Sequence, residues 1–238
     1  MKIFITGSST GLGALTAKSL LAKGNDVVLH ARNKKRVEDA LKFNPQASDV
    51  VIGDLSKIED VKSIAQQVNK LGPFDVIIHN AGVYTNDSSQ TLAVNVVAPY
   101  MLTNLIDLPK RLIYISSGMH VGSRLDVNKL DDLDYSGSKL AVLLIAKAVE
   151  RKHPEVIVNS IDPGWVPTRM GGSGANDSLE GGYQGQVWLA SGDDKQALTS
   201  GNYYYHSKLS KYDERIDNTE LQNKLVDKLA QITGIKMR

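Results

Sequence analysis

The chain has 238 residues, of which 42% are hydrophobic, so it can bury a substantial core in one α/β domain. Its net charge of +2, from 28 basic and 26 acidic residues, does not favour nucleic acid or an anionic membrane as the main partner. The absence of cysteine excludes disulfides, a thiolate nucleophile and a cysteine-ligated zinc site. We therefore expect a small-molecule partner, and a reducing cytoplasm as the compartment.

No run of about 20 apolar residues occurs, so the sequence predicts no membrane span. Lys2, Ile3, Phe4 and Ile5 are compatible with the start of a signal peptide, but glycine and serine interrupt the apolar run from Gly7 onward. The same residues are better interpreted as a strand followed by a glycine-rich turn.

Short apolar runs bounded by turn residues alternate with longer amphipathic stretches, which is typical of repeated strand and helix units in a parallel sheet. The expected strands are Lys2–Thr6, Asp26–Ala31, Val50–Asp54, Phe74–His79, Arg111–Ser117, Val156–Asp162 and Gly201–His206. The expected helices are Gly11–Lys23, Lys34–Phe43, Lys57–Leu71, Gln90–Ile106, Tyr135–Lys152, Leu179–Ala190 and Thr219–Thr233. Residues 1–238 are thus predicted to form one α/β domain, a doubly wound sheet of about seven parallel strands with helices on both faces.

The turn at residues 6–13, Thr-Gly-Ser-Ser-Thr-Gly-Leu-Gly, directly follows the first expected strand and precedes an amphipathic helix that ends at Gly24. Glycines in such a turn let phosphate groups approach the backbone and the helix N-terminus. A flexible turn without a ligand is the alternative. The strand, turn and helix context favours dinucleotide binding.

The second expected strand ends without an acidic residue. Arg32 follows it, and then come Asn33, Lys34, Lys35 and Arg36. Folds that prefer NAD place a carboxylate here, where it binds the ribose hydroxyls and repels a 2′-phosphate, whereas a guanidinium binds phosphate well. The sequence therefore predicts NADP, with NADPH preferred over NAD and Arg32 as the residue that recognises the phosphate. The three cations from Lys34 to Arg36 have the alternative of a solvated first helical turn.

Polar and small residues also follow the later expected strands, at the edge where open parallel sheets bind ligands. They are Asp54-Leu55, His79-Asn80-Ala81-Gly82, Ser116-Ser117 and Pro163-Gly164-Trp165-Val166-Pro167-Thr168. Asp54 has the alternative of capping the next helix, and Asn80 that of serving a turn. His79 is interpreted as strand-end packing or a local hydrogen bond. The five histidines lack ligand spacing, so no metal is predicted.

Tyr135 and Lys139 are four residues apart at the start of an expected helix, so they share one face of it. An ammonium group beside a phenol favours the ionised form and lowers its pKa from the usual value of about 10. Such a phenol, beside a nicotinamide, can exchange a proton with a carbonyl or an alcohol. The same spacing is common on surface helices, and it is the glycine-rich turn and Ser117 that favour catalysis.

These motifs resemble the short-chain dehydrogenase/reductase family, in its common single-domain branch, and the resemblance covers nearly the whole chain. It implies a Rossmann-type fold and an oxidoreductase that transfers hydride between a nicotinamide and a carbonyl or alcohol substrate. It also implies that Tyr135 is the acid/base and that Lys139 holds the nicotinamide ribose. Ser117 would bind the substrate oxygen, with Ser116 as the alternative, and Asn95 would organise a water path to the lysine.

The cofactor-binding residues implied by the motifs and the resemblance are Gly7, Ser9, Thr10, Gly11, Leu12, Gly13, Arg32, Asn33, Asp54, Leu55, Asn80, Ala81, Gly82, Tyr135, Lys139, Pro163, Gly164, Val166 and Thr168. Two intervals depart from the family spacing. The interval from Ser117 to Tyr135 is long, which predicts an enlarged loop with His120 and Arg124 beside the pocket. The interval from Asn80 to Asn95 is short, which counts against the role that the resemblance gives Asn95.

Candidates to line a substrate pocket, with core packing as their alternative, are Tyr84, Met119, His120, Trp165, Met170, Tyr183 and Trp188. The resemblance implies a homodimer or homotetramer, because family members pair the helices that correspond to Gln90–Ile106 and Tyr135–Lys152. The second helix is apolar all round, which predicts a covered outer face, and a cover from the same subunit is the alternative. Other readings of the chain are a non-catalytic NADP-sensing protein and a sugar-nucleotide epimerase of the longer family branch.

Overall fold

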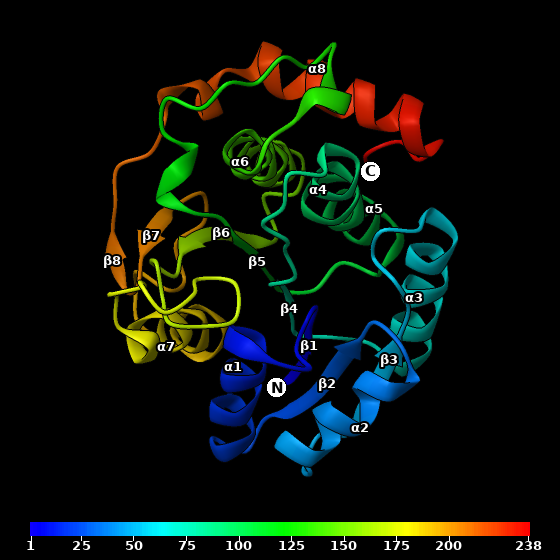
Figure 1. The fold of residues 1–238 in the computed structure, drawn as a ribbon, viewed down its shortest axis with the longest axis vertical. Coiled ribbons are helices and arrows are strands. Elements are labelled where there is room, and N and C mark those ends of the chain that lie inside the picture. The colour runs from blue at the N-terminus through cyan, green and yellow to red at the C-terminus, as the bar shows by residue number, and fades with distance from the viewer.

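The computed structural model describes residues 1–238 and is built around one eight-stranded sheet (Figure 1). The spatial order is β3 (Asp49–Ile52), β2 (Asp26–Ala31), β1 (Lys2–Ile5), β4 (Val76–His79), β5 (Arg111–Ile115), β6 (Ile157–Asp162), β7 (Tyr203–Tyr205) and β8 (Lys208–Leu209). All neighbouring pairs from β3 to β7 are parallel, and β8 alone is antiparallel to its neighbour. The predicted doubly wound sheet is confirmed.

The short strand β8 is a strand that the sequence did not predict. It pairs with β7 through a tight reversal in which His206 has a φ of 54°, as two-residue hairpins require at their first central position. A strand of two residues carries no periodicity, so a sequence pattern cannot show it.

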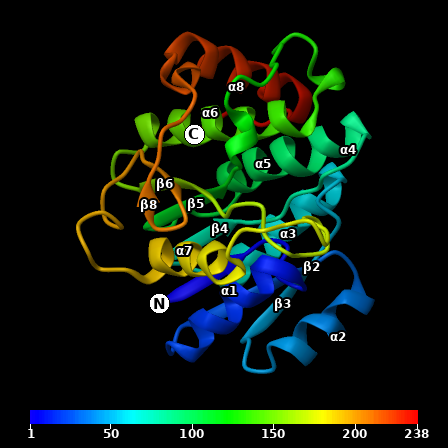
Figure 2. The same cartoon turned by 60° about the vertical axis from the view of Figure 1, so that its left-hand side comes forward.

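Helices cover both faces of the sheet (Figure 2). One face carries α1 (Gly11–Ala22), α2 (Lys34–Phe43) and α7 (Leu179–Ser191). The other carries α3 (Ile58–Leu71), α4 (Ser88–Leu92), α5 (Ala98–Leu105) and α6 (Tyr135–Lys152), with α8 (Thr219–Thr233) outside α6. Judged by length and apolar character together, none of these helices qualifies as a membrane span.

The core consists of two layers, one on each side of the sheet. In β1, Phe4 belongs to the layer under α3, α5 and α6, while Ile3 and Ile5 belong to the layer under α1 and α7. Successive residues of a strand point to opposite faces, so a strand covered on both sides must be apolar throughout. This burial explains the continuous apolar runs that mark the strands in the sequence.

The expected helix Gln90–Ile106 consists of three consecutive segments, because a π-helical turn at Ala93–Val97 separates α4 from α5. Pro99 lies in the first turn of α5. A proline has no N–H and its ring clashes with the carbonyl four residues earlier, here that of Asn95, so a wider turn accommodates it. The irregular turn therefore lies where the predicted functional residue Asn95 lies.

The apolar helix α6 is covered within the chain. Its central residues, from Leu140 to Ala146, are buried, and α8 lies across its outer side (Figure 1). The C-terminal residue Arg238 also donates hydrogen bonds to the carbonyl oxygens of Asn104 and Ile106, at 2.6 and 2.7 Å. The apolar character of α6 is thus explained without a second subunit, and assembly stays a prediction.

The contact between α6 and α8 predicts a large loss of stability on truncation of Leu229, which is fully buried. We expect Leu229→Ala to lower the free energy of unfolding by about 2–5 kcal/mol, because transfer and cavity terms add at a buried leucine. Chemical denaturation measures this change. Gln231→Ala, at an exposed position of the same helix, is the control, and equal losses in the two variants would contradict the packing described.

Candidate active site

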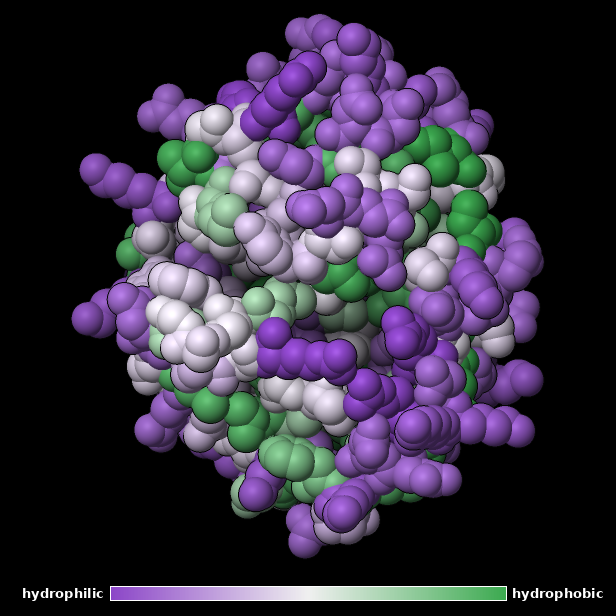
Figure 3. Space-filling model, viewed as in Figure 1, coloured by the Kyte–Doolittle hydropathy of each residue, from purple (hydrophilic) through white to green (hydrophobic).

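The residues predicted from the sequence gather at one edge of the sheet, because β1, β2, β4, β5 and β6 are parallel and end there. The space-filling view is hollowed near the middle of the molecule (Figure 3). Neutral and apolar side chains border most of this hollow, and strongly hydrophilic ones lie along its lower edge. The side chains of Tyr135, Lys139, Ser117 and Asn95 reach the same edge of the sheet from α6, the end of β5 and the π-helical turn.

The glycine-rich turn has the shape that a bound phosphate needs. Gly7 and Gly11 have φ of 65° and 62°, in the left-handed region that only glycine adopts without strain. A Cβ on Gly13 would come within 2.7 Å of the Gly7 carbonyl oxygen and would also collide with Asn80. These three positions therefore require glycine, and the space beside the turn stays free of side chains.

The N-terminus of α1 lacks a capping side chain and has no acidic residue in its first turn. Side chains cap five of the other α-helices, and these caps are Asn33, Asp87, Asp134, Ser178 and Asn218. Uncapped N–H groups at a helix start bind anions. Thr10, Gly11, Leu12 and Gly13 thus present a site that fits a pyrophosphate, with Ser9 beside it.

Hydrogen bonds fix the turn to the loop that follows β4. The Asn80 amide donates to the Thr6 and Gly7 carbonyl oxygens at 2.9 and 3.3 Å, and the Ala81 N–H donates to the Thr6 hydroxyl at 3.0 Å. Asn80 therefore has the turn-stabilising role that was its alternative, and this role positions the phosphate loop.

His30 is a supporting residue that the sequence analysis missed. Its Nδ1 accepts a hydrogen bond from the Gly7 N–H at 3.0 Å, and its Nε2 lies 2.9 Å from the Gly53 carbonyl oxygen. The ring is buried, and burial lowers its pKa, so it is neutral near pH 7. Its position at the end of β2 is the signal that could have revealed it.

Arg32 and Asn33 follow β2 at the surface. Arg32 is exposed, and its charge helps to lower the pKa of Asp54. Asn33 uses its side chain to cap α2, accepting from the Arg36 N–H at 3.1 Å. Arg36 pairs with Asp39 at 2.9 Å, in agreement with the solvated-turn alternative for this residue. Arg32 is thus better placed than Arg36 to bind an external anion.

Asp54 and Leu55 follow β3 and differ in exposure. The Asp54 carboxylate accepts hydrogen bonds from the N–H and hydroxyl of Ser56, at 3.0 and 2.8 Å, so it stabilises a local turn and does not cap α3. Leu55 is buried in the larger core layer. Any contact of Leu55 with a cofactor therefore has to use its backbone.

Lys139 lies one turn after the start of α6 and is almost completely buried, and its Nζ donates to the Ile115 carbonyl oxygen at 2.9 Å. The same ammonium group lies over the ring of Tyr135, 5.4 Å from its centre. Tyr84 makes an edge contact with the same ring, at a centroid distance of 4.9 Å. The phenol is thus held by the lysine and a second aromatic ring.

Burial dominates the titration of both residues. It raises the pKa of Tyr135 to about 12, while the nearby Ser117 hydroxyl acts in the opposite direction. Burial also lowers the pKa of Lys139 to about 8, against the attraction of Asp162. The structure thus departs from the expected lowering of the Tyr135 pKa, because loss of water outweighs the cation. Tyr135 is protonated near neutral pH.

The two serines at the end of β5 have different environments. Ser116 is buried, and its hydroxyl donates to the Lys139 carbonyl oxygen at 3.0 Å. Ser117 is half-buried beside the Tyr135 phenol and accepts only a long bond from the Met119 N–H, at 3.3 Å. Ser117 is therefore the hydroxyl available to a substrate, and Ser116 ties β5 to α6.

Asn95 lies next to the lysine despite its short spacing from Asn80. Its amide donates to the Ser138 hydroxyl at 3.0 Å and exchanges two hydrogen bonds with the backbone of Val83. A Cβ on Gly82 would lie 3.5 Å from both Asn95 Oδ1 and Lys139 Nζ, so these three residues meet at one point.

The loop after β6 folds back on itself. Pro163 and Val166 are buried, and Gly164 has a φ of 81°. The Trp165 indole donates to the Gly171 carbonyl oxygen at 2.9 Å, and the Thr168 hydroxyl accepts from the Gly171 N–H at 3.3 Å. These contacts give the loop a defined shape beside the site.

Asp162, the last residue of β6, is a second residue that the sequence analysis missed. Its carboxylate accepts from the Gly118 N–H at 2.7 Å and the Gly164 N–H at 2.8 Å, and so joins the loops after β5 and β6. It also contributes to the raised pKa of Tyr135. A carboxylate at the end of a parallel strand follows the rule used for Asp54, which could have revealed it.

The seven candidates for a substrate pocket divide into two groups. Four are exposed in loops at this edge, and they are Tyr84, Met119, Trp165 and Met170. The other three are not exposed in these loops, because His120 is fully buried in the loop after β5 and Tyr183 and Trp188 pack against the core layer under α7. The four residues of the first group form an apolar rim in the loops after β4, β5 and β6.

Comparisons with known proteins agree with this geometry. The model of the short chain dehydrogenase family matches residues 1–178. The short-chain dehydrogenase chyC of Penicillium rubens is 35% identical over 254 residues, which cover 99% of this chain and 98% of the relative. An uncharacterized oxidoreductase of Emericella nidulans is 38% identical over 249 residues, covering 99% and 98% of the two chains.

Among solved structures, an uncharacterized protein from Mycobacterium Paratuberculosis has a TM-score of 0.81 and 23% identity, with 100% of this chain and 94% of that chain covered. At this identity the likeness concerns the fold. The family match extends over Asn95, Ser117, Tyr135 and Lys139, and the relatives align from end to end. The chain therefore belongs to the short-chain dehydrogenase/reductase family, oxidoreductases that act on CH–OH and C=O groups.

Proposed function

We propose that residues 1–238 form one NADPH-dependent reductase domain that acts on bulky, largely apolar carbonyl compounds. The observation that carries the proposal is the protonated Tyr135 phenol beside the free hydroxyl of Ser117, with Lys139 against the tyrosine ring. A proton donor and a hydrogen-bond donor at one point are what the reduction of a carbonyl group needs.

The chain can hold a dinucleotide with groups from the start of α1, from the loops after β2 and β3, and from α6. The N–H groups at the start of α1 would bind the pyrophosphate, Arg32 the 2′-phosphate, and Asp54 the adenine side. Lys139 would bind the nicotinamide ribose. When bound, NADPH supplies a hydride to the carbonyl carbon. Structural neighbours solved with this cofactor support the choice, namely a metagenomic blue fluorescent protein in complex with NADPH and a Pseudomonas aeruginosa RhlG/NADP complex.

Residues of the chain then bind and protonate the substrate oxygen. The Ser117 hydroxyl donates a hydrogen bond to it, and Tyr135 transfers its phenolic proton as negative charge develops. The Lys139 ammonium group, held by the Ile115 carbonyl, stabilises the phenolate that remains. Asn95, at the same point as Lys139, is placed to order water through which the proton is replaced.

The apolar rim supports a bulky substrate. Tyr84 and Trp165 are 63% and 55% exposed, so large aromatic surfaces in the loops after β4 and β6 are open to a ligand. A mouse relative named retinol dehydrogenase 13 is 25% identical over 283 residues, covering 99% of this chain, and its name supports an apolar substrate. A homodimer or homotetramer and a cytoplasmic location remain predictions, and an assembly would have to use a surface other than the covered face of α6.

A panel of ketones with NADPH and NADH, followed by nicotinamide absorbance, tests the function. We expect Tyr135→Phe to lower kcat at least about 10²-fold, because only the transferable proton is removed. The dissociation constant for NADPH, measured on the same variant, should stay within about twofold of wild type. Cofactor binding without turnover of any carbonyl by the wild type would instead favour the NADP-sensing alternative.

The pKa of Lys139, lowered to about 8, predicts an alkaline limit for reduction. As the pH rises through this value the ammonium loses its proton, while Tyr135, with a pKa of about 12, stays protonated. We expect kcat/KM for the carbonyl substrate to fall about tenfold per pH unit above that point. Lys139→Arg should shift the limit upward. A wild-type profile that is flat to about pH 10 would contradict this assignment.

The exposed position of Arg32 after β2 predicts a preference for NADPH over NADH. We expect Arg32→Ala to lower the ratio of kcat/KM for NADPH over NADH at least about tenfold, roughly 1.4 kcal/mol, because the guanidinium binds the 2′-phosphate. Arg36→Ala is the matched control, since Arg36 is already paired with Asp39. Steady-state kinetics with both cofactors measure the ratio, and the same ratio in Arg32→Ala and wild type would remove the physical basis for NADP preference.

A further inference from the structure

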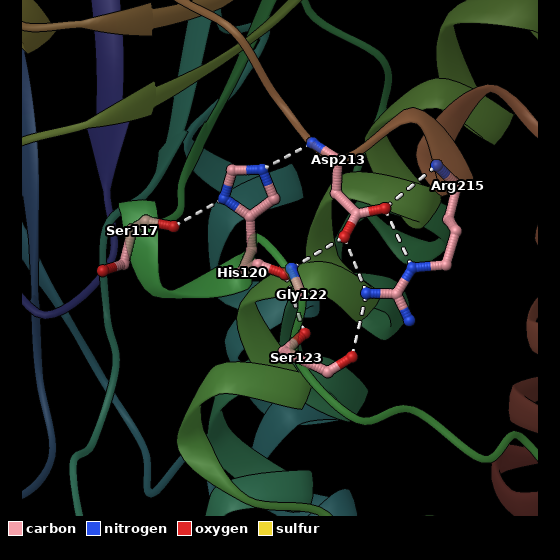
Figure 4. A network of polar contacts seen from close by, with 6 residues as sticks. All are labelled: Ser117, His120, Gly122, Ser123, Asp213 and Arg215. Atoms are coloured by element: carbon pink, nitrogen blue, oxygen red, sulfur yellow. Dashed lines mark hydrogen bonds and ion pairs between the residues drawn. The ribbon is translucent and has the colours of Figure 1, made fainter.

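His120 is completely buried in the loop after β5, three residues beyond Ser117. Its Nδ1 lies 2.7 Å from the Ser117 carbonyl oxygen, and its Nε2 lies 3.1 Å from the backbone nitrogen of Asp213 (Figure 4). A carbonyl oxygen only accepts and a backbone N–H only donates, so Nδ1 carries the hydrogen and Nε2 offers its lone pair. The two contacts thus require one neutral tautomer of His120.

Asp213 is itself held in place from two sides. Its carboxylate accepts from the Gly122 N–H at 3.0 Å and from two guanidinium nitrogens of Arg215 at 2.8 and 2.7 Å. Arg215 also donates to the Ser123 carbonyl oxygen at 2.8 Å. Arg215 holds the pKa of Asp213 well below its usual range, so the pair is ionised at neutral pH. The segment that carries Asp213 and Arg215 is therefore anchored to the loop beside His120.

Other contacts leave the imidazole ring little freedom. It makes a T-shaped contact with the ring of Tyr203, at a centroid distance of 4.9 Å and an interplanar angle of 67°. Burial lowers the pKa of His120, against the attraction of Asp213 and Asp162. Asp162 also accepts from the Gly118 N–H, so the backbone is fixed immediately after Ser117 as well. The Ser117 carbonyl oxygen is thus bonded to a fixed imidazole ring, and that ring is bonded to the anchored segment at Asp213.

We propose that His120 is a positioning residue for Ser117. By joining the Ser117 carbonyl to the Asp213 amide, it fixes the backbone of the serine and thereby the direction in which the hydroxyl points toward Tyr135. The inference rests on the proposed function, because it concerns the hydroxyl that would bind the substrate oxygen. The support comes from residues 203–217, which lie beyond the segment 1–178 that the family model matches.

A double-mutant cycle between His120 and Ser117 tests whether one acts through the other. We expect His120→Ala to lower kcat for ketone reduction about tenfold or more, because a misdirected hydroxyl no longer fits the developing oxyanion. The NADPH dissociation constant should change less than about twofold. In a Ser117→Ala background the same substitution should cost less than about threefold, because the group it positions is already gone.

Effects that multiply in the double variant, or an unchanged kcat in His120→Ala, would overturn the inference. His120→Asn keeps an amide nitrogen near the place of Nδ1 and should recover part of the kcat lost in His120→Ala. His120→Asn also provides the test if the alanine variant does not fold. His120→Gln is then the comparison, because its longer side chain places the amide nearer to the position of Nε2. A kcat of His120→Asn no higher than that of His120→Gln would count against the inference.

Glu214→Gln, at an exposed position of the same segment, is the control and should keep the wild-type kcat. Arg215→Ala removes the support of Asp213 and should lower kcat in the same direction as His120→Ala. The experiment distinguishes the failure of the two hypotheses. A wild-type protein that reduces no carbonyl compound would contradict the proposed function. An active wild type together with full turnover in His120→Ala would contradict only the positioning role of His120.

Discussion

The attachment of α6 to the end of β5 is the constraint on which the site depends. Lys139 donates its ammonium to the Ile115 carbonyl and accepts a hydrogen bond from Ser116 on its own carbonyl. A buried ammonium without a partner would be costly, so the first contact is enforced by burial itself. Because Tyr135 is one helical turn before Lys139 and Ser117 is one residue after Ser116, the same attachment brings phenol and hydroxyl together.

A second set of bonds makes the cofactor end equally rigid. Asn80 reaches the carbonyl oxygens at the end of β1, and His30 reaches the Gly7 N–H from β2 and the Gly53 carbonyl after β3. Four strand ends are thus linked around the glycine-rich turn, and the N–H groups of α1 stay free of side-chain caps. Asn80 and His30 thus find their partners inside this edge, while the N–H groups at the start of α1 are left for a ligand.

Short-range patterns predicted the strands, the glycine-rich turn and the pair Tyr135/Lys139, because each depends on neighbours within a few residues. They could not show β8, which is too short for a period, or the π-helical turn, where Pro99 alters a helix that looks continuous in sequence. They also missed contacts between distant residues. Asp213 reaches His120 across 93 positions, and no local spacing encodes such a pair.

The expected effect of Lys139 on Tyr135 shows the same limit in energetic terms. The spacing correctly placed the cation beside the ring, but spacing carries no information on how much water the fold removes. Since desolvation acts on both charges, it raises the pKa of the phenol and lowers that of the ammonium group. The resulting neutral phenol is suited to giving a proton to a carbonyl oxygen, whereas taking one from an alcohol requires its ionisation. The burial that stabilises α6 against the sheet therefore also keeps Tyr135 in its protonated form near neutral pH.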